Sequence, residues 1–261
     1  VTKTAIEGNW SAASSWNPSG VPDSTDVVMV PAGATVTVDS TAATAKDLCI
    51  HGTVAFATNA STRIIVRTIF VYGDGTLRVG EKGAPIAPAV TAEIVFADVP
   101  LNTALDPSQY WNGLLALGKV TMHGAAMNET FVQLDRDVAA GATLIPLVRA
   151  VTGWKAGDAV VFHGTRQLSK DDVDQWGNAK GWQWERRAIA GISGDGKTIT
   201  LAAPLSYAHF GAKDPDGTPS VASDGYRLMP YVANLSRNII VRSQTLQETG
   251  KAKYCTTVDK I

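Results

Sequence analysis

Cysteine is scarce in this sequence, which holds only Cys49 and Cys255 among its 261 residues. Two cysteines cannot build the set of bridges that stabilises small secreted domains, and their wide spacing excludes a local zinc motif. They could form one long-range bridge, or be one buried and one exposed thiol. The sequence leaves both alternatives open.

An excess of one charge is also missing, as is any long apolar run. The 23 lysines and arginines almost balance the 24 aspartates and glutamates, for a net charge of −1. That balance gives no reason to expect a nucleic-acid partner. No stretch approaches the roughly 18 apolar residues of a membrane helix, so no transmembrane segment is expected in this chain.

Glycine and proline are plentiful, with 24 glycines and 12 prolines. Because they interrupt the chain every few residues, they leave no room for long helices and favour short strands joined by turns. Alternation of apolar and polar residues supports this, for example at 35–38, 64–66 and 76–79. The sequence therefore predicts an all-β protein.

A glycine-led pattern recurs along the first part of the chain. It begins at Gly52, Gly75 and Gly118, and the second interval is almost twice the first. This spacing is typical of one and then two coils of a β-solenoid, in which each coil covers its neighbour. We expect these glycines to adopt positive φ at the corners. A β-sandwich would show the same strand spacing, and periodicity alone does not separate the two.

The pattern changes in the middle of the chain. Residues 188–192 and 197–201 flank Asp195-Gly196 and predict a β-hairpin. We therefore expect a β-helix at 1–129, an inserted small β-barrel or sandwich at 130–204, and a return to a β-helix rung with a tail at 205–261. A polar loop rich in tryptophan and aspartate is expected at 165–187.

Ordered segments of this chain resemble the eight-glycine (G8) domain family. They are Asn9-Trp10, Gly20-Val21-Pro22-Asp23, Leu48-Cys49-Ile50-His51-Gly52, Gly75-Thr76-Leu77-Arg78-Val79-Gly80, Met122-His123-Gly124, Trp154-Lys155-Ala156-Gly157-Asp158, Glu185-Arg186-Arg187 and Asn234-Leu235-Ser236-Arg237-Asn238. G8 domains occur in cell-surface hyaluronidases, in fibrocystin-like receptors and in many bacterial secreted proteins.

The resemblance implies a right-handed parallel β-helix with an inserted small β-barrel or sandwich. It also implies an extracellular or cell-surface location. Because the sequence begins with Val1 and not with Met, we expect that a signal peptide has been removed, although a trimmed chain would look the same. The partner it implies is a polysaccharide or cell-surface glycan. In long relatives further coils follow the segment at 234–238, so this chain is expected to be a portion or a short relative of a hyaluronidase-like protein.

Candidate chemistry gathers between Asp171 and Arg187. Glycoside cleavage generally uses two carboxylates, while aromatic faces stack on sugar rings and arginine grips a carboxylate. The candidate catalytic residues are Asp172, Asp174, Glu185 and His209, and the candidate ligand-binding residues are Trp176, Trp182, Trp184, Arg186 and Arg187. The alternative is a solvated loop whose tryptophans pack on the inserted domain.

Metal sites have weaker support. Asp171 and Asp174 could contribute to a calcium loop, although the EF-hand pattern is not met. His51 and His123 could approach each other if they occupy equivalent rung ends. No cofactor other than calcium is suggested.

Three functions remain open from the sequence. The first is a hyaluronidase-like polysaccharide hydrolase or a portion of one, and the second is a non-catalytic adhesion or binding module. The third is an exported metal-binding protein. Whether the chain is an enzyme stays undecided at this point.

Overall fold

The computed structural model describes residues 1–100, 102–166 and 181–245. Within these residues the protein is built from strands, and its single helical segment is a short 3-10 turn at Ala13–Ser15. The all-β prediction is confirmed. Within the described residues the chain divides into two compact units, the first formed by residues 1–125 and 237–245, the second by residues 126–236.

The first unit contains two sheets, and the chain passes repeatedly from one to the other. The eight-stranded sheet comprises β1 (Lys3–Ala5), β3 (Trp16–Asn17), β4 (Val27–Val30), β6 (Ala43–Ile50), β8 (Thr62–Val71), β10 (Ala92–Phe96), β11 (Leu114–Ala116) and β19 (Ile239–Ser243). The five-stranded sheet comprises β2 (Gly8–Asn9), β5 (Thr35–Val38), β7 (Thr53–Phe56), β9 (Thr76–Val79) and β12 (Lys119–Met122). Apart from β1 with β3, the pairs in both sheets are parallel.

Alternation along these strands separates an inner from an outer face. In β6, Ala43 and Ala45 are buried while Thr44 is half-buried and Lys46 is exposed. Parallel register stacks like positions, so that Leu48 lies beside Ile69 of β8 and Val28 of β4. The inner side chains form one apolar core that includes Val28, Leu48, Ile69 and Leu77.

The glycine-led turns lie where two backbone segments approach each other closely, but glycine is not required there for the predicted reason. Gly52, Gly75 and Gly118 are absent from the residues with positive φ, so the expectation of a left-handed corner was wrong. A Cβ on Gly75 would lie 2.0 Å from the carbonyl oxygen of Ile50, and one on Gly118 would lie 2.0 Å from that of Tyr72. These positions require glycine because neighbouring backbones touch there.

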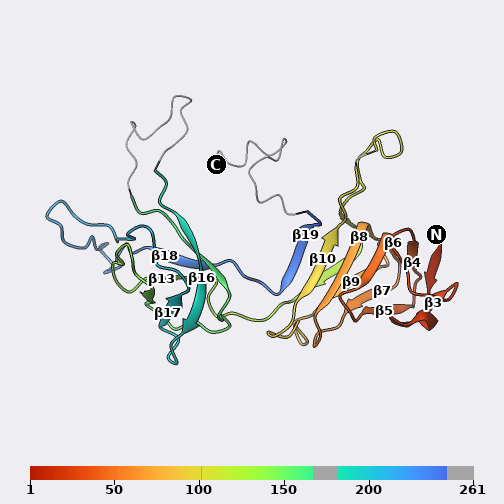
Figure 1. The fold of residues 1–261 in the computed structure, drawn as a ribbon, viewed down its shortest axis with the longest axis horizontal. Helices are drawn as coiled ribbons and strands as arrows, with labels where there is room; N and C mark the ends of the chain where they lie inside the picture. Colours follow the sequence, from red (N-terminus) through yellow and green to blue (C-terminus); the bar gives the residue numbers. More distant parts are fainter. Residues whose placement is uncertain (101, 167–180, 246–261) are drawn as a thin grey trace. The chain divides into compact units, whose positions relative to one another are not determined.

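A strand distant in sequence completes the eight-stranded sheet. β19 pairs in parallel with β10, and Figure 1 shows the two side by side. Asn238, just before β19, donates from Nδ2 to the carbonyls of Ile86, Ala87 and Val90 and accepts the Ala125 N–H at Oδ1. One buried amide therefore anchors the returning chain to two segments of the first unit.

The second unit is an antiparallel sheet of six strands. Their order is β13 (Phe131–Gln133), β18 (Tyr231–Asn234), β15 (Ala159–Phe162), β16 (Glu185–Ile192), β17 (Thr198–Leu201) and β14 (Leu144–Pro146). A bridge between Leu134 and Leu147 joins the ends of the first and last strands, so the sheet closes on itself. Its core includes Val132, Ile145, Val160, Phe162 and Ile199.

The second unit differs from the expected insertion at its far end. Residues 205–236 belong to it, because β18 pairs with both β13 and β15. The predicted hairpin is present as β16 and β17, with Gly196 at φ +72° in its turn. Asp195 accepts hydrogen bonds from Ser193 and Lys197 there, and these bonds lower the pKa of its carboxyl group.

Candidate functional site

The structure describes only some of the predicted site residues. Asp171, Asp172, Asp174 and Trp176 lie outside the described residues. Trp182, Trp184, Glu185, Arg186, Arg187 and His209 are described and belong to the second unit. The geometry of the site is therefore built from these six residues and their neighbours.

Trp182 and Trp184 border a hollow on the second unit. Their exposed fractions are 49% and 54%, which are large for tryptophan in a folded domain. The hollow has a volume of about 340 Å³, and its lining is His163, Gly164, Arg166, Trp182, Gln183 and Trp184. Two indole rings therefore present apolar surface to a small concavity.

His163 connects this hollow to a second one. Nδ1 of His163 lies 3.0 Å from the Gly164 carbonyl oxygen, and Nε2 lies 3.1 Å from the Tyr231 backbone nitrogen. A carbonyl oxygen can only accept a hydrogen bond, so Nδ1 carries the proton. A backbone N–H can only donate one, so Nε2 is the acceptor, and His163 is the neutral tautomer protonated at Nδ1. Both ring nitrogens are hydrogen-bonded, and His163 lines both hollows.

The second hollow measures about 290 Å³ and also contains aromatic side chains. Besides His163, its lining is Thr165, Phe210, Gly211, Ala212, Tyr226, Leu228, Met229, Pro230 and Tyr231. The hydroxyl groups of Tyr226 and Tyr231 share a hydrogen bond, and this bond together with burial raises the pKa of Tyr231. The two hollows thus form one aromatic surface, here called the aromatic hollow, on either side of His163.

Glu185 and His209 meet below this surface. Nε2 of His209 lies 2.9 Å from Oε1 of Glu185, and Nδ1 lies 2.9 Å from the His163 carbonyl oxygen. Both ring nitrogens face acceptors, so the hydrogen-bond geometry fits a doubly protonated imidazole beside a carboxylate. The side chain of His209 is 0% exposed and that of Glu185 4%, so neither lines the aromatic hollow.

Arg187 completes this buried network. Its guanidinium pairs with Glu185 and donates to the Pro204 carbonyl and the Ser206 hydroxyl. Glu185 also accepts the backbone N–H groups of Ser206 and Tyr207. Burial alone would raise the pKa of Glu185, but these hydrogen bonds, His209 and Arg187 together lower it below its ordinary value of 4.5.

The remaining predicted residues are placed separately. Arg186 is exposed on β16 next to Trp184. In the first unit, His51 stacks on Tyr72 with ring centroids 4.0 Å apart and bonds to Asp74 at 2.9 Å, while His123 is exposed at the end of β12. Across the described ranges, no group of three or more His, Cys, Asp or Glu side chains lies close enough to hold a metal ion.

Several residues of the aromatic hollow were not predicted from the sequence. His163, Phe210, Tyr226 and Tyr231 were not singled out as site residues. The one local signal for these residues is that aromatic side chains recur at 207–231, a largely polar segment without the alternation typical of a strand. Their convergence depends on β18 joining β13 and β15, which is a long-range contact.

A family comparison accounts for the first part of the chain. The family model of the G8 domain matches residues 15–135. The chain carries a G8 domain. The match covers most of the first unit, including the turns at Gly52, Gly75 and Gly118, and it extends to β13 of the second.

Relatives align well beyond the G8 domain. Fibrocystin-L of Mus musculus is 28% identical over 254 residues, and that of Homo sapiens is 27% identical over the same length. Fibrocystin of Mus musculus is 25% identical over 250 residues. Each alignment covers 94% of this chain but only 5% or 6% of the relative. The chain therefore spans about a twentieth of the length of these curated relatives.

Proposed function

We propose that the protein is an extracellular glycan-binding module, and that the aromatic hollow of the second unit is its binding surface. The observation that carries the proposal is the pair of half-exposed indoles, Trp182 and Trp184, beside a concavity. Apolar ring faces stack on the C–H faces of sugars while the rim supplies hydrogen bonds. Gln183 and Arg166 are the polar groups of that rim.

The extracellular assignment rests on the G8 domain and its fibrocystin relatives. The part of the chain that the structure describes contains no helix with the length and apolarity of a membrane span. We further infer that the first unit forms coils of a right-handed parallel β-helix. The repeated passage between two parallel sheets supports this inference.

Binding without catalysis is the function that the described residues support. Among the described residues, none that lines the aromatic hollow carries a carboxylate, and the side chains of Glu185 and His209 are buried. A hyaluronidase-like hydrolase stays the second candidate, because the resemblance suggests it and because Asp172 and Asp174 remain predicted catalytic carboxylates. Release of reducing ends from hyaluronan by the purified protein would favour this candidate.

Replacing Trp182 or Trp184 by alanine is expected to weaken glycan binding about tenfold, which corresponds to about 1.4 kcal/mol. The melting temperature should barely change, because each side chain is already half exposed. Calorimetric titration with a hyaluronan decasaccharide and with cellohexaose measures the loss. Tyr110→Ala, which removes a 64% exposed ring from the first unit, is the matched control.

Two outcomes would count against this function. If wild-type protein binds neither oligosaccharide nor any member of a wider glycan panel, the proposal fails. If the tryptophan variants bind as wild type but melt at a much lower temperature, the indoles serve packing instead of recognition.

A further inference from the structure

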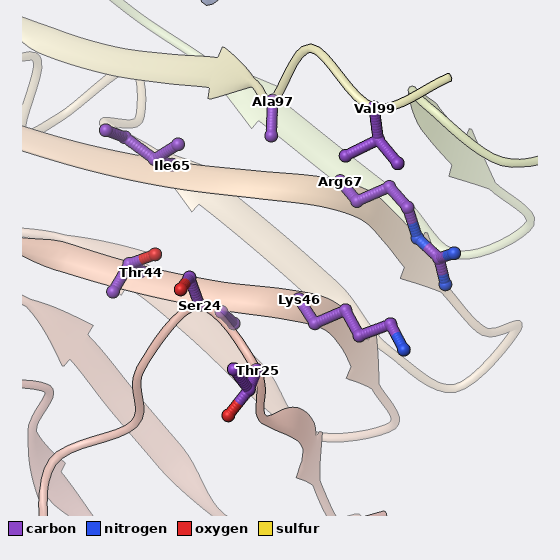
Figure 2. Close-up of a pocket in the computed structure, with 9 residues that line it drawn as sticks. Ser24, Thr25, Thr44, Lys46, Ile65, Arg67, Ala97 and Val99 are labelled. Carbon is purple, nitrogen blue, oxygen red and sulfur yellow. The ribbon is translucent and has the colours of Figure 1, made fainter. Parts of the chain in front are cut away.

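A separate hollow lies on the outer face of the eight-stranded sheet in the first unit. It has a volume of about 380 Å³ and is lined by Ser24, Thr25, Thr44, Ala45, Lys46, Ile65, Arg67, Ala97 and Val99. Figure 2 shows Ser24 and Thr25 on one side and Ala97 and Val99 on the other. We call it the sheet hollow. Its size is within the range of small-ligand sites.

The floor of the sheet hollow follows directly from strand register. Thr44 of β6 pairs with Ile65 of β8, and both point away from the core because their neighbours Ala43, Ala45, Ile64 and Val66 are buried. A hydroxyl and an aliphatic side chain therefore lie side by side. Such a floor suits a ligand that has both C–H and hydroxyl groups on one face.

The two cations of the sheet hollow have different environments. Arg67 bonds to Asp47 through Nε at 2.8 Å and through a second nitrogen, and its guanidinium lies 4.1 Å from the centroid of the Trp111 ring. Its charge is therefore compensated and its position fixed. Lys46 is exposed, and within the described residues its Nζ has no ion-pair or hydrogen-bond partner.

Figure 2 shows the Lys46 and Arg67 side chains extending to the same end of the hollow. Each of the nearby carboxylates accepts hydrogen bonds from groups other than Lys46. Asp47 pairs with Arg67, Asp23 accepts from Thr25, and Asp26 accepts from Thr2 and from the Asp23 N–H. An unpaired ammonium thus stands at one end of a concavity whose other groups are hydroxyls and aliphatic chains.

We propose that the sheet hollow binds an acidic sugar unit, with Lys46 holding its carboxylate or sulfate group. The sugar ring rests on Thr44 and Ile65, and the Ser24 and Thr44 hydroxyls reach its hydroxyl groups. This proposal rests on the glycan-binding function proposed above and adds to it a preference for acidic glycans. A charge-assisted bond from Lys46 supplies that preference.

The test is calorimetric titration of the full chain with a hyaluronan decasaccharide, a chondroitin sulfate decasaccharide and neutral cellohexaose. Lys46→Gln is expected to lower affinity for the acidic oligosaccharides three- to tenfold and to leave cellohexaose binding unchanged. Lys46→Arg should restore most of the loss. Lys82→Gln, which removes another exposed lysine of the same unit, should change nothing.

Thr44→Phe provides a second, independent variant, because it fills the hollow from an outward strand position and keeps every charge. It should weaken acidic-glycan binding as Lys46→Gln does, while the melting temperature stays within a few degrees of wild type. Equal binding of a deca-glutamate peptide, lost in the same variants, would overturn the sugar assignment in favour of an acidic peptide.

The two proposals fail in different ways. If no glycan binds, the proposed function itself is lost. If glycans bind, and Trp182→Ala weakens this binding as expected while Lys46→Gln and Thr44→Phe leave the affinity for acidic oligosaccharides unchanged, only the assignment of the sheet hollow is overturned. The uronate and sulfate sources are separated by comparing the hyaluronan and chondroitin sulfate titrations.

Discussion

Glu185→Ala is expected to lower the stability of the second unit by about 3–5 kcal/mol, the cost of breaking a buried charge pair by removing one partner. Without Glu185, the buried His209 and the Arg187 guanidinium lose their shared carboxylate, and the Ser206 and Tyr207 N–H groups lose their acceptor. In a unit of this size the melting transition should fall by more than about 10 °C. Scanning calorimetry measures the shift.

Glu129→Gln is the matched control for this substitution. Glu129 also pairs with one arginine, Arg149, but that arginine side chain is 62% exposed. An exposed pair contributes about 0–1 kcal/mol, so the control should melt within a few degrees of wild type. If Glu185→Ala behaves like Glu129→Gln, the buried network does not stabilise the unit.

The same network predicts a pH dependence. Because the pKa of Glu185 is lowered in the folded protein, its carboxylate contributes stability that is fully present above its ordinary value of 4.5. That contribution is lost as the pH falls through the lower, folded value. Wild-type protein should therefore lose melting temperature below about pH 4.5, and Glu185→Gln should show a shallower acid dependence. Parallel acid profiles for the two proteins would exclude Glu185 as the source.

Local pattern was a reliable guide to the strands of this protein. Alternation at residues 35–38 and 76–79 predicted β5 and β9, and the Asp195-Gly196 turn predicted the hairpin of β16 and β17. These signals work because each strand buries one face and each tight turn needs a particular backbone. Both requirements are met within a few residues and can be recognised without the fold.

The role of Glu185 and Arg187 was harder to predict, although the alternation held a signal. Glu185, Arg187 and Ile189 occupy the same face of β16, and Ile189 is in the core. Trp184 and Arg186 alternate with these residues along the chain, and both are exposed. From composition, Glu185 was predicted as a catalytic residue, and Trp184, Arg186 and Arg187 were predicted as ligand contacts. The structure separates the exposed indoles from a charge network that is buried because the segment containing His209 lies over β16.

Contacts between distant segments account for what the sequence did not reveal. Residues 205–236 belong to the second unit because β18 pairs with β13 and β15, and no local pattern indicates that pairing. The aromatic hollow depends on the same contact, since Tyr226 and Tyr231 come from that segment. The Asn234-Leu235-Ser236-Arg237-Asn238 motif also owes its role to contacts with distant segments. Its two asparagines are buried and bond to Asp158 and to the carbonyls of residues 86, 87 and 90.

Gly75→Ala is expected to destabilise the first unit by about 3 kcal/mol or more, the upper end of the cost of overpacking. The added Cβ would lie 2.0 Å from the Ile50 carbonyl oxygen, which accepts the Tyr72 N–H at 3.0 Å. Relieving that clash requires the backbone at Gly75 to move away from the backbone at Ile50. The turn that contains Gly75 connects β8 to β9. Its displacement therefore weakens the parallel pairing of β8 with β6 and of β9 with β7. Gly118→Ala should act in the same way, because its Cβ would lie 2.0 Å from the Tyr72 carbonyl oxygen and 2.5 Å from that of Gly75.

Gly73→Ala, two residues away in the same turn, separates this steric effect from the loss of glycine as such. A Cβ at Gly73 has no atom within 4 Å, and its φ is not positive. This variant should be neutral or gain up to about 1 kcal/mol through the entropy of the unfolded chain. Chemical denaturation of both variants, followed by tryptophan fluorescence, gives the difference between them. Equal stabilities would show that the backbones of Gly75 and Ile50 do not approach each other closely, and the requirement for glycine in these turns would then need another cause.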